Sequence, residues 1–266
     1  MKNLCKALTI AGSDSGGGAG IQADLKTFQA FDVYGMSAIT AVTAQNTVGV
    51  RSVMDISPKL IYDQIEMVSK DIGVDACKIG MLSNAEIINA VCKALKATSL
   101  KRVVLDPVMV AKSGDFLLKK GDEKHLVKNL LPLCYLITPN IPEAELIAGI
   151  SIQTNEDMMQ AIFKMRDMGA KNILLKGGHM PGNNLTDILF DGENFHRFSS
   201  QRVDSKNTHG TGCTLSAAIA ASLAKGENLY HAVKLGRNFV LSAIKEAPVN
   251  IGKGHGPMYH NIKVSY

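Results

Sequence analysis

A polar, glycine-spaced loop in the last quarter of the chain reads Asn207-Thr208-His209-Gly210-Thr211-Gly212-Cys213-Thr214 and leads into a helix of small residues. The first turn of such a helix leaves backbone N–H groups without intrahelical partners, and the helix dipole adds partial positive charge there. Because Gly210 and Gly212 lack side chains, an anion can approach this backbone closely. We call residues 207–214 the anion loop, and the pattern predicts a phosphate-binding loop with the thiol of Cys213 at its entrance.

Two other interpretations of the anion loop remain open at the level of its residues. An ordinary helix start with a threonine cap and an incidental buried cysteine has the same pattern. His209 and Cys213 also suggest a Cys–His hydrolase, because nucleophilic cysteines are found at helix N-termini. A spacing of four with two glycines does not bring these side chains into contact, however, and no orienting third group is evident.

The composition is that of a globular protein. The chain has 266 residues, of which 46% are hydrophobic and 20% charged, so it can bury a sizeable core. No repeat, low-complexity segment or linker divides it, and we expect a single domain over residues 1–266. The net charge of +5 is mild, and the chain has no long basic run and no Trp. Nucleic-acid binding is therefore not indicated.

Cysteine usage and hydropathy indicate a cytoplasmic protein with reduced thiols. No pair of cysteines forms C-x-x-C, which argues against a disulfide framework and a zinc site. No apolar run approaches the length of a membrane span, so no membrane partner is expected. Met1 to Ile10 is predicted to be a first strand rather than a signal peptide, because it runs directly into Gly12-Ser13-Asp14. The five cysteines are Cys5, Cys77, Cys92, Cys134 and Cys213.

Short apolar runs alternate with amphipathic ones, which is typical of an α/β fold with a mostly parallel sheet covered on both faces. Predicted strands cover residues 4–10, 36–44, 76–79, 102–105, 134–138 and 172–176, and a hairpin joins 185–190 to 194–198. Predicted helices cover residues 21–31, 126–131, 155–168, 213–225 and 229–245, and others begin at Pro58, after Asn84 and near Pro142.

Polar residues follow the C-terminal ends of several predicted strands. In an open parallel sheet, ligands bind just beyond this edge. We therefore expect a binding site at the edge where five residues gather: Asp14, Gln45, Asp106, Asn140 and Lys176.

A second glycine-rich segment, residues 13–20, follows the first predicted strand, and we call it the glycine loop. The dinucleotide motif G-x-G-x-x-G fails from Gly16, and from Gly18 it fits only in a relaxed form with no acidic residue after the next strand. The P-loop motif fails because Leu25 stands before Lys26-Thr27. The glycine loop is either a tight strand-to-helix turn or a loop that approaches a substrate, and the anion loop remains the main phosphate-binding candidate.

Side-chain chemistry suggests roles for the polar residues, each beside a simpler structural role. The Gln45 amide offers a donor and an acceptor together, which reading the edge of a nitrogen heterocycle requires, but it also suits a loop hydrogen bond. Asp106 and Glu143 are candidates to hold Mg²⁺, although Glu143 also suits a helix start. Lys176 suits a phosphate or simple exposure to solvent. Asp24, near the start of the first helix, also suits a solvated first-turn carboxylate that favours the helix dipole.

Taken together, these segments resemble the hydroxymethylpyrimidine/phosphomethylpyrimidine kinases of thiamine biosynthesis. The resemblance runs in order from about residue 7 to about residue 257, and the combination of motifs is highly specific. It rests on residues 11–27 (AGSDSGGGAGIQADLKT), Ala44-Gln45-Asn46-Thr47, Lys78-Ile79-Gly80-Met81-Leu82, Asp106-Pro107-Val108-Met109, Thr138-Pro139-Asn140-x-x-Glu143, Lys176-Gly177-Gly178-His179 and the anion loop.

The resemblance implies a ribokinase-like fold, a three-layer αβα sandwich with a central, mostly parallel sheet and a small lid. It implies ATP and Mg²⁺, a homodimer, and phosphorylation of 4-amino-5-hydroxymethyl-2-methylpyrimidine and then of its monophosphate to the diphosphate. It also implies a pyrimidine pocket lined by Gly12, Asp24, Thr43, Gln45 and Met81, ATP binding by Asp106, Asn140, Lys176 and Gly178, Mg²⁺ held by Asp106 with Glu143, and an anion hole of Gly210, Thr211, Gly212 and Cys213.

The chain departs from the family pattern in three places. Most ribokinase-like enzymes carry Asp as general base where Cys213 stands, and we expect the helix start to lower the pKa of this thiol. A related group of pyridoxal kinases carries Cys in the lid where Ala111 stands here, which disfavours pyridoxal without excluding it. Pro is missing after Asp14, which predicts only a looser turn. Pyridoxal or pyridoxine kinase activity and a non-catalytic pyrimidine-binding sensor are the alternatives.

Overall fold

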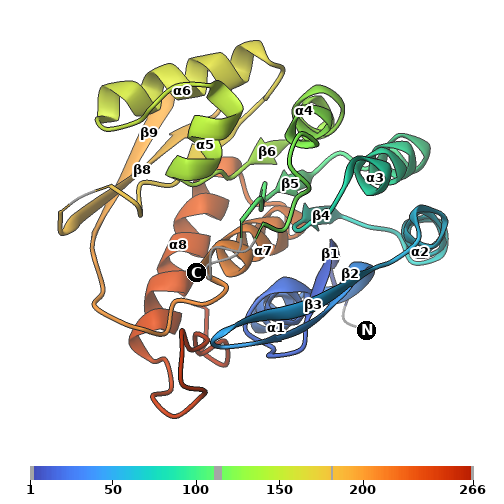
Figure 1. The fold of residues 1–266 in the computed structure, drawn as a ribbon, viewed down its shortest axis with the longest axis horizontal. Helices are drawn as coiled ribbons and strands as arrows, with labels where there is room; N and C mark the ends of the chain where they lie inside the picture. Colours follow the sequence, from blue (N-terminus) through green and yellow to red (C-terminus); the bar gives the residue numbers. More distant parts are fainter. Residues whose placement is uncertain (1–2, 111–115, 181, 265–266) are drawn as a thin grey trace.

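The computed structural model describes residues 3–110, 116–180 and 182–264. Within these ranges nine strands form one continuous sheet, and helices cover both of its faces (Figure 1). This confirms the predicted α/β fold with three layers. The lid position Ala111, on which the comparison with pyridoxal kinases depends, lies outside the described residues.

The sheet is parallel in its centre and antiparallel at both margins. Its order is β3-β2-β1-β4-β5-β6-β7-β8-β9. The run from β2 to β7 is parallel, whereas β3 pairs antiparallel with β2, and β8 and β9 continue antiparallel from β7. The strands are β1 (Lys6–Asp14), β2 (Tyr34–Asn46), β3 (Gly49–Asp55), β4 (Ala76–Ile79), β5 (Val103–Leu105), β6 (Leu136–Ile137), β7 (Ile173–Leu175), β8 (Asn184–Phe190) and β9 (Phe195–Gln201).

The helices divide between the two faces of the sheet (Figure 1). One face carries α1 (Gly20–Ala30), α7 (Thr211–Ala224) and α8 (Leu229–Lys245). The other carries α2 (Pro58–Asp71), α3 (Ala85–Thr98), α4 (Glu123–His125), α5 (Ile141–Ala148) and α6 (Asn155–Asp167). None of the helices in the described ranges has the length and apolar character that crossing a membrane requires.

Alternation along each strand builds the two apolar layers. In β5, Val103 and Leu105 pack into the core under α2 and α3, while Val104 between them packs against α7. Successive side chains of a strand point to opposite faces, so a strand buried on both faces reads as one continuous apolar run. This is why β4 and β5 were recognisable in the sequence.

Local capping signals set where several helices begin. Asn84 accepts a hydrogen bond from the amide of Ile87 and starts α3, as predicted. Ser57 precedes Pro58 at the start of α2. Reciprocal capping boxes start α5, with Asn140 and Glu143, and α6, with Thr154 and Asp157. These bonds satisfy amides that the first turn leaves open, so side-chain chemistry alone marks the helix starts.

Two regions differ from the sequence-based prediction. Strand β3 was not predicted, because residues 51–55 are all exposed and carry no apolar alternation, and only the ladder to β2 holds them. The helix predicted over residues 126–131 forms a π-helical turn at Leu126–Leu130 and a 3₁₀ turn at Leu131–Leu133. Pro132 has no N–H to donate, so a regular α-helix cannot continue through it.

Candidate active site

A cavity of about 1500 Å³ opens along the C-terminal edge of the parallel strands. Its wall includes the ends of β1 and β2 and the residues that follow β5, β6 and β7, so the polar strand ends noted in the sequence gather at one cavity. All but one of the predicted site residues border it: Gly12, Thr43, Gln45, Met81, Asp106, Asn140, Glu143, Lys176, Gly178, Gly210, Thr211, Gly212 and Cys213.

The anion loop lies directly on the glycine loop. Gly210 has φ 79° and forms the N-cap of α7, and a Cβ there would stand 1.9 Å from the carbonyl oxygen of Gly18. Only glycine fits such a backbone conformation and such a close approach. The alternative interpretation with a threonine cap is therefore wrong, because Gly210, which has no capping side chain, starts the helix. The first residues of α7 border the cavity, and the open amides of such a helix start suit an anion.

A charged pair lies against the first turn of α7. Lys176 Nζ donates to Asp106 Oδ1 at 2.9 Å, and a Cβ on Gly212 would lie 3.2 Å from Asp106 Oδ2 and 3.4 Å from Lys176 Nζ. Thr138 Oγ1 also donates to Asp106, at 3.3 Å. A phosphate at the helix start would thus meet backbone amides and an ammonium group together. Lys176 is paired and largely buried rather than free in solvent.

Glu143 stands at the start of α5 on the same cavity wall. Its side chain accepts a hydrogen bond from the Asn140 amide at 2.8 Å, and its own amide donates to Asn140 Oδ1 at 2.9 Å. Burial raises the pKa of Glu143 to about 7, although the charge of Lys176 opposes this and that of Asp106 adds to it. A cation bound nearby would lower this pKa and favour the ionised form of Glu143.

The donor set at this wall fits Mg²⁺ better than a metal held by the protein alone. In the described ranges no three His, Cys, Asp or Glu side chains lie close enough together to bind an ion. Asp106 and Glu143 are two carboxylates facing one cavity, and the charge of Asp106 helps to raise the pKa of Glu143. Mg²⁺ keeps several waters and takes one or two carboxylates together with substrate phosphates, so two carboxylates suffice.

Asp24 and Lys78 form a buried pair beneath the cavity. Lys78 Nζ donates to Asp24 Oδ2 at 2.8 Å with both side chains fully buried, and Thr9 Oγ1 donates to the same oxygen at 2.6 Å. The alternative of a solvated Asp24 is therefore wrong, and Asp24 does not border the cavity as the resemblance implied. Lys78 borders it instead. The sequence analysis did not select Lys78, although a lysine inside an otherwise apolar strand is a signal that could have indicated it.

Cys213 lies in the first turn of α7 and borders the cavity. Burial raises the pKa of its thiol to about 11, which outweighs the opposing charge of Lys78. The expectation that the helix start would lower this pKa is wrong, because burial disfavours the charged thiolate more strongly than the surrounding positive charge and hydrogen bonding favour it. Cys213 is thus a protonated thiol at neutral pH.

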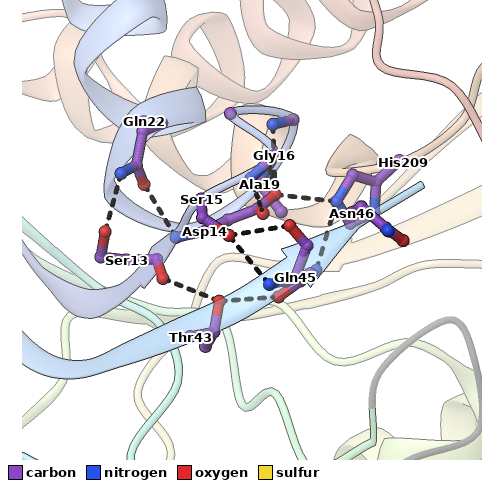
Figure 2. Close-up of polar contacts among 12 residues, drawn as sticks. Ser13, Asp14, Ser15, Gly16, Ala19, Gln22, Thr43, Gln45, Asn46 and His209 are labelled. Carbon is purple, nitrogen blue, oxygen red and sulfur yellow. Dashed lines mark hydrogen bonds and ion pairs between the residues drawn. The ribbon is translucent and has the colours of Figure 1, made fainter. Parts of the chain in front are cut away.

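A polar network links the glycine loop, β2 and the anion loop (Figure 2). Asp14 accepts from His209 Nε2 at 2.9 Å and from the amides of Gly16 at 2.7 Å and Ala19 at 2.8 Å. Burial alone would raise the pKa of Asp14, but these bonds prevail and lower it. His209 is therefore bound to Asp14 rather than to Cys213, which removes the geometry that a Cys–His hydrolase needs.

Gln45, near the end of β2, is part of this network. Its backbone is held by Ser15, whose Oγ accepts from the Gln45 amide and donates to the Gln45 carbonyl, both at 2.8 Å. In its side-chain amide, Gln45 Oε1 lies 3.3 Å from Thr43 Oγ1, and Gln45 Nε2 lies 3.4 Å from His209 Nε2. A register shift in the ladder to β3 at Ala44/Gln45 accompanies this turn of the side chain toward the cavity.

The C-terminal segment adds residues that the sequence analysis did not predict. His255 donates its backbone amide to the carbonyl of Thr47 at 2.9 Å, and His209 pairs with Pro257 through a short parallel bridge. Thr47, Gly254 and His255 border the cavity. A segment without periodicity thus closes the rim between the β2–β3 turn and the anion loop, and only a glycine at 254 leaves room for the Thr47 backbone.

Residues 14–259 match the family model described as phosphomethylpyrimidine kinase. The chain belongs to this family. It is 48% identical over 259 residues to the hydroxymethylpyrimidine/phosphomethylpyrimidine kinase of Bacillus subtilis, covering 97% of this chain and 95% of the relative. It is 51% identical to the enzyme of that name from Haemophilus influenzae, covering 98% of both. Members of this family are phosphotransferases, and so is this protein.

Solved structures of kinases share the fold. The ADP complex of Bacillus subtilis pyridoxal kinase has a TM-score of 0.88 and 42% identity, covering 97% of this chain and 98% of that one. Phosphomethylpyrimidine kinase from Clostridium difficile has a TM-score of 0.81 and 48% identity, covering 90% and 99%. Pyridoxal kinase from Staphylococcus aureus, solved with pyridoxal, has a TM-score of 0.89 and 36% identity, covering 98% of this chain and 97% of that one. These likenesses confirm the ribokinase-like fold that the motifs implied.

Proposed function

We propose that this kinase transfers the γ-phosphoryl group of ATP to the hydroxymethyl group of 4-amino-5-hydroxymethyl-2-methylpyrimidine, and then phosphorylates the monophosphate to the diphosphate. One observation carries the proposal: the Gln45 amide and the start of α7 border one cavity. The first suits a nitrogen heterocycle, and the second suits a phosphate. Family membership and relatives of the same name support this choice.

Each part of the cavity has a proposed role in the transfer. The hydroxyl oxygen attacks Pγ, the bond from Pγ to the β-phosphate oxygen breaks, and ADP leaves. Amides from Gly210 to Cys213 hold the oxygens of the moving phosphoryl group, and Lys176 adds positive charge beside them. Asp106 and Glu143 would hold Mg²⁺ through its waters, and the ion would neutralise phosphate charge. Catalysis is then mainly positioning and charge stabilisation.

Cys213 occupies the position where the family resemblance places the general base. Its thiol stays protonated at neutral pH, so it cannot act as the base that removes the hydroxyl proton. In a loose phosphoryl-transfer transition state catalysis is mainly positioning and charge stabilisation, so no protein base is required. We propose that the Cys213 thiol orients the substrate hydroxyl by hydrogen bonding, and that the hydroxyl proton passes to an oxygen of the transferred phosphoryl group as the new P–O bond forms.

A product assay tests the proposed function directly. The protein is incubated with ATP, Mg²⁺ and the hydroxymethylpyrimidine, and products are followed by phosphorus NMR and by ADP release. We expect monophosphate first and diphosphate later. Absence of both products, with rapid phosphorylation of pyridoxal in a parallel reaction, would overturn the proposal in favour of a pyridoxal kinase. Tight pyrimidine binding without any ADP release would instead identify a non-catalytic sensor.

Two further properties are proposed from the family resemblance. We expect a homodimer, which light scattering coupled to size-exclusion chromatography will report as twice the mass of one chain. We also expect a cytoplasmic protein, and fractionation of cells that produce it natively should recover it with soluble cytoplasmic markers. A monomer, or recovery with membranes, would contradict these expectations.

A further inference from the structure

One polar network in the cavity decides which way the Gln45 amide faces (Figure 2). Asp14 is held as a carboxylate, because hydrogen bonds from His209 and two backbone amides lower its pKa despite burial. A carboxylate accepts hydrogen bonds and donates none. His209 Nε2 lies 2.9 Å from Asp14 Oδ2, so this nitrogen carries the hydrogen and donates it to Asp14.

The same hydrogen constrains Gln45. The oxygen and nitrogen of a glutamine amide are assigned from their surroundings. With Gln45 Nε2 lying 3.4 Å from His209 Nε2, one N–H group would face another. Turning the amide by half a turn brings Oε1 to the imidazole N–H and the NH₂ group to Thr43 Oγ1. The Thr43 hydroxyl donates to the Ser13 carbonyl at 2.9 Å, so its lone pairs are free to accept from that NH₂ group.

We propose that His209 is a specificity-determining positioning residue that holds Gln45 with its oxygen toward the anion loop and its NH₂ group toward Thr43. The proposal rests on the proposed function. Oε1 has a second lone pair and the NH₂ group a second hydrogen, so Gln45 presents an acceptor and a donor side by side in a fixed order. That order reads the substrate in one direction only.

The order matches an aminopyrimidine whose amino group lies next to its hydroxymethyl group. The hydroxymethyl group must reach Cys213, and His209 lies in the same loop four residues earlier. The neighbouring 4-amino group, a donor, then meets Oε1, and the ring nitrogen beyond it, an acceptor, meets the NH₂ group. Pyridoxal carries a C–H group and an aldehyde beside its hydroxymethyl carbon, and neither is an N–H donor. The fixed amide therefore selects against it.

The test compares two substrates that differ by one group: the hydroxymethylpyrimidine and its analogue lacking the 4-amino group. Both binding, by calorimetry, and turnover are measured. In His209→Leu we expect kcat/KM for the aminopyrimidine to fall roughly 10- to 100-fold and its preference over the analogue to approach one, because a site built for hydrogen bonds loses discrimination when its partner is misplaced. The KM for ATP should stay within about twofold.

Two controls separate positioning from a structural role. His209→Gln keeps a side-chain N–H group of similar reach, so it should recover part of the preference. In a Gln45→Ala background, His209→Leu should change the preference by less than about twofold, because the residue through which it acts is gone. An unchanged preference in His209→Leu would overturn the proposal, and so would equal losses for both substrates or additive effects in the double variant.

The controls also deal with the packing of the imidazole on the glycine loop. A Cβ on Gly18 would stand 2.5 Å from His209 Cδ2, so a shift of this loop is a real consequence of removing the ring. Such a shift should lower activity on both pyrimidines by the same factor, so the preference for the aminopyrimidine over its analogue would stay unchanged. If the wild-type protein phosphorylates neither pyrimidine, the proposed function fails, and calorimetry of the same two ligands still decides whether His209 sets the binding preference.

Discussion

Cys213 shows at the scale of one residue how burial changes a chemical role. Its raised pKa keeps the thiol protonated, so it cannot accept the hydroxyl proton, and its role is to orient the substrate hydroxyl. Cys213→Ala should lower kcat by roughly 100-fold, within the range for removing one hydrogen-bonding group at the reacting centre, with the KM for ATP changed by less than about twofold. Steady-state kinetics with both substrates checks this. Wild-type turnover in the variant would remove Cys213 from the reaction.

The pair of Lys78 and Asp24 is a second residue-scale feature, and its effect is on stability. Lys78→Met leaves the Asp24 carboxyl buried without its partner, and we expect a loss of about 3–5 kcal/mol in the free energy of unfolding. Urea denaturation measures it. Replacing both residues, as in Lys78→Met with Asp24→Leu, should recover most of that loss. Lys59→Met, which breaks an exposed ion pair on α2, serves as a control with little measurable effect.

At the scale of elements, two helices begin with the same kind of capping box and only one faces the cavity. Asn140→Ala at α5 and Thr154→Ala at α6 should each cost about 1 kcal/mol of stability. Asn140→Ala should also raise the KM for MgATP several-fold, because Asn140 borders the cavity and anchors Glu143. Denaturation and kinetics on both variants check this. Identical kinetics in the two would show that Asn140 acts only as a cap.

Whether an element could be predicted from the sequence depended on how far apart in the chain the residues that hold it lie. Helix starts with capping residues were predictable because the bonds involved lie within three residues of one another. Strand β3 was not predictable, because its exposed residues are held by pairing with β2 rather than by their own pattern. Likewise, Lys78 and Asp24 lie on different elements, 54 residues apart, and only the packed fold shows that they neutralise each other.

At the scale of the whole molecule, the C-terminal segment is held against α7 by His260. Its imidazole lies 2.9 Å from Thr214 Oγ1, and burial, together with the charge of Lys26, lowers its pKa from 6.5 to about 4. The unfolded chain therefore binds the extra proton first as the pH falls. Stability is full above pH 6.5 and should decrease by about 2–3 kcal/mol as the pH drops toward 4.

His260→Gln keeps a polar partner for Thr214 without a titrating imidazole. Its free energy of unfolding should depend less on pH between 6.5 and 4 than that of the wild type, and the difference between the two curves isolates this one group. Urea denaturation at half-unit pH intervals measures it. His125→Gln on α4 is a matched histidine control, and parallel curves for wild type and His260→Gln would contradict the assignment.

Local sequence patterns were enough to predict the α/β class, the mostly parallel sheet, the polar edge that borders the cavity and the position of the anion loop. These follow from signals carried within short stretches: apolar runs, polar residues at strand ends, and glycines before a helix. Tertiary structure decided the rest, because it depends on distance and desolvation between remote residues. It buried Asp24 with Lys78, raised the pKa of Cys213, brought the C-terminal segment to the cavity rim, and placed His209 between Asp14 and Gln45.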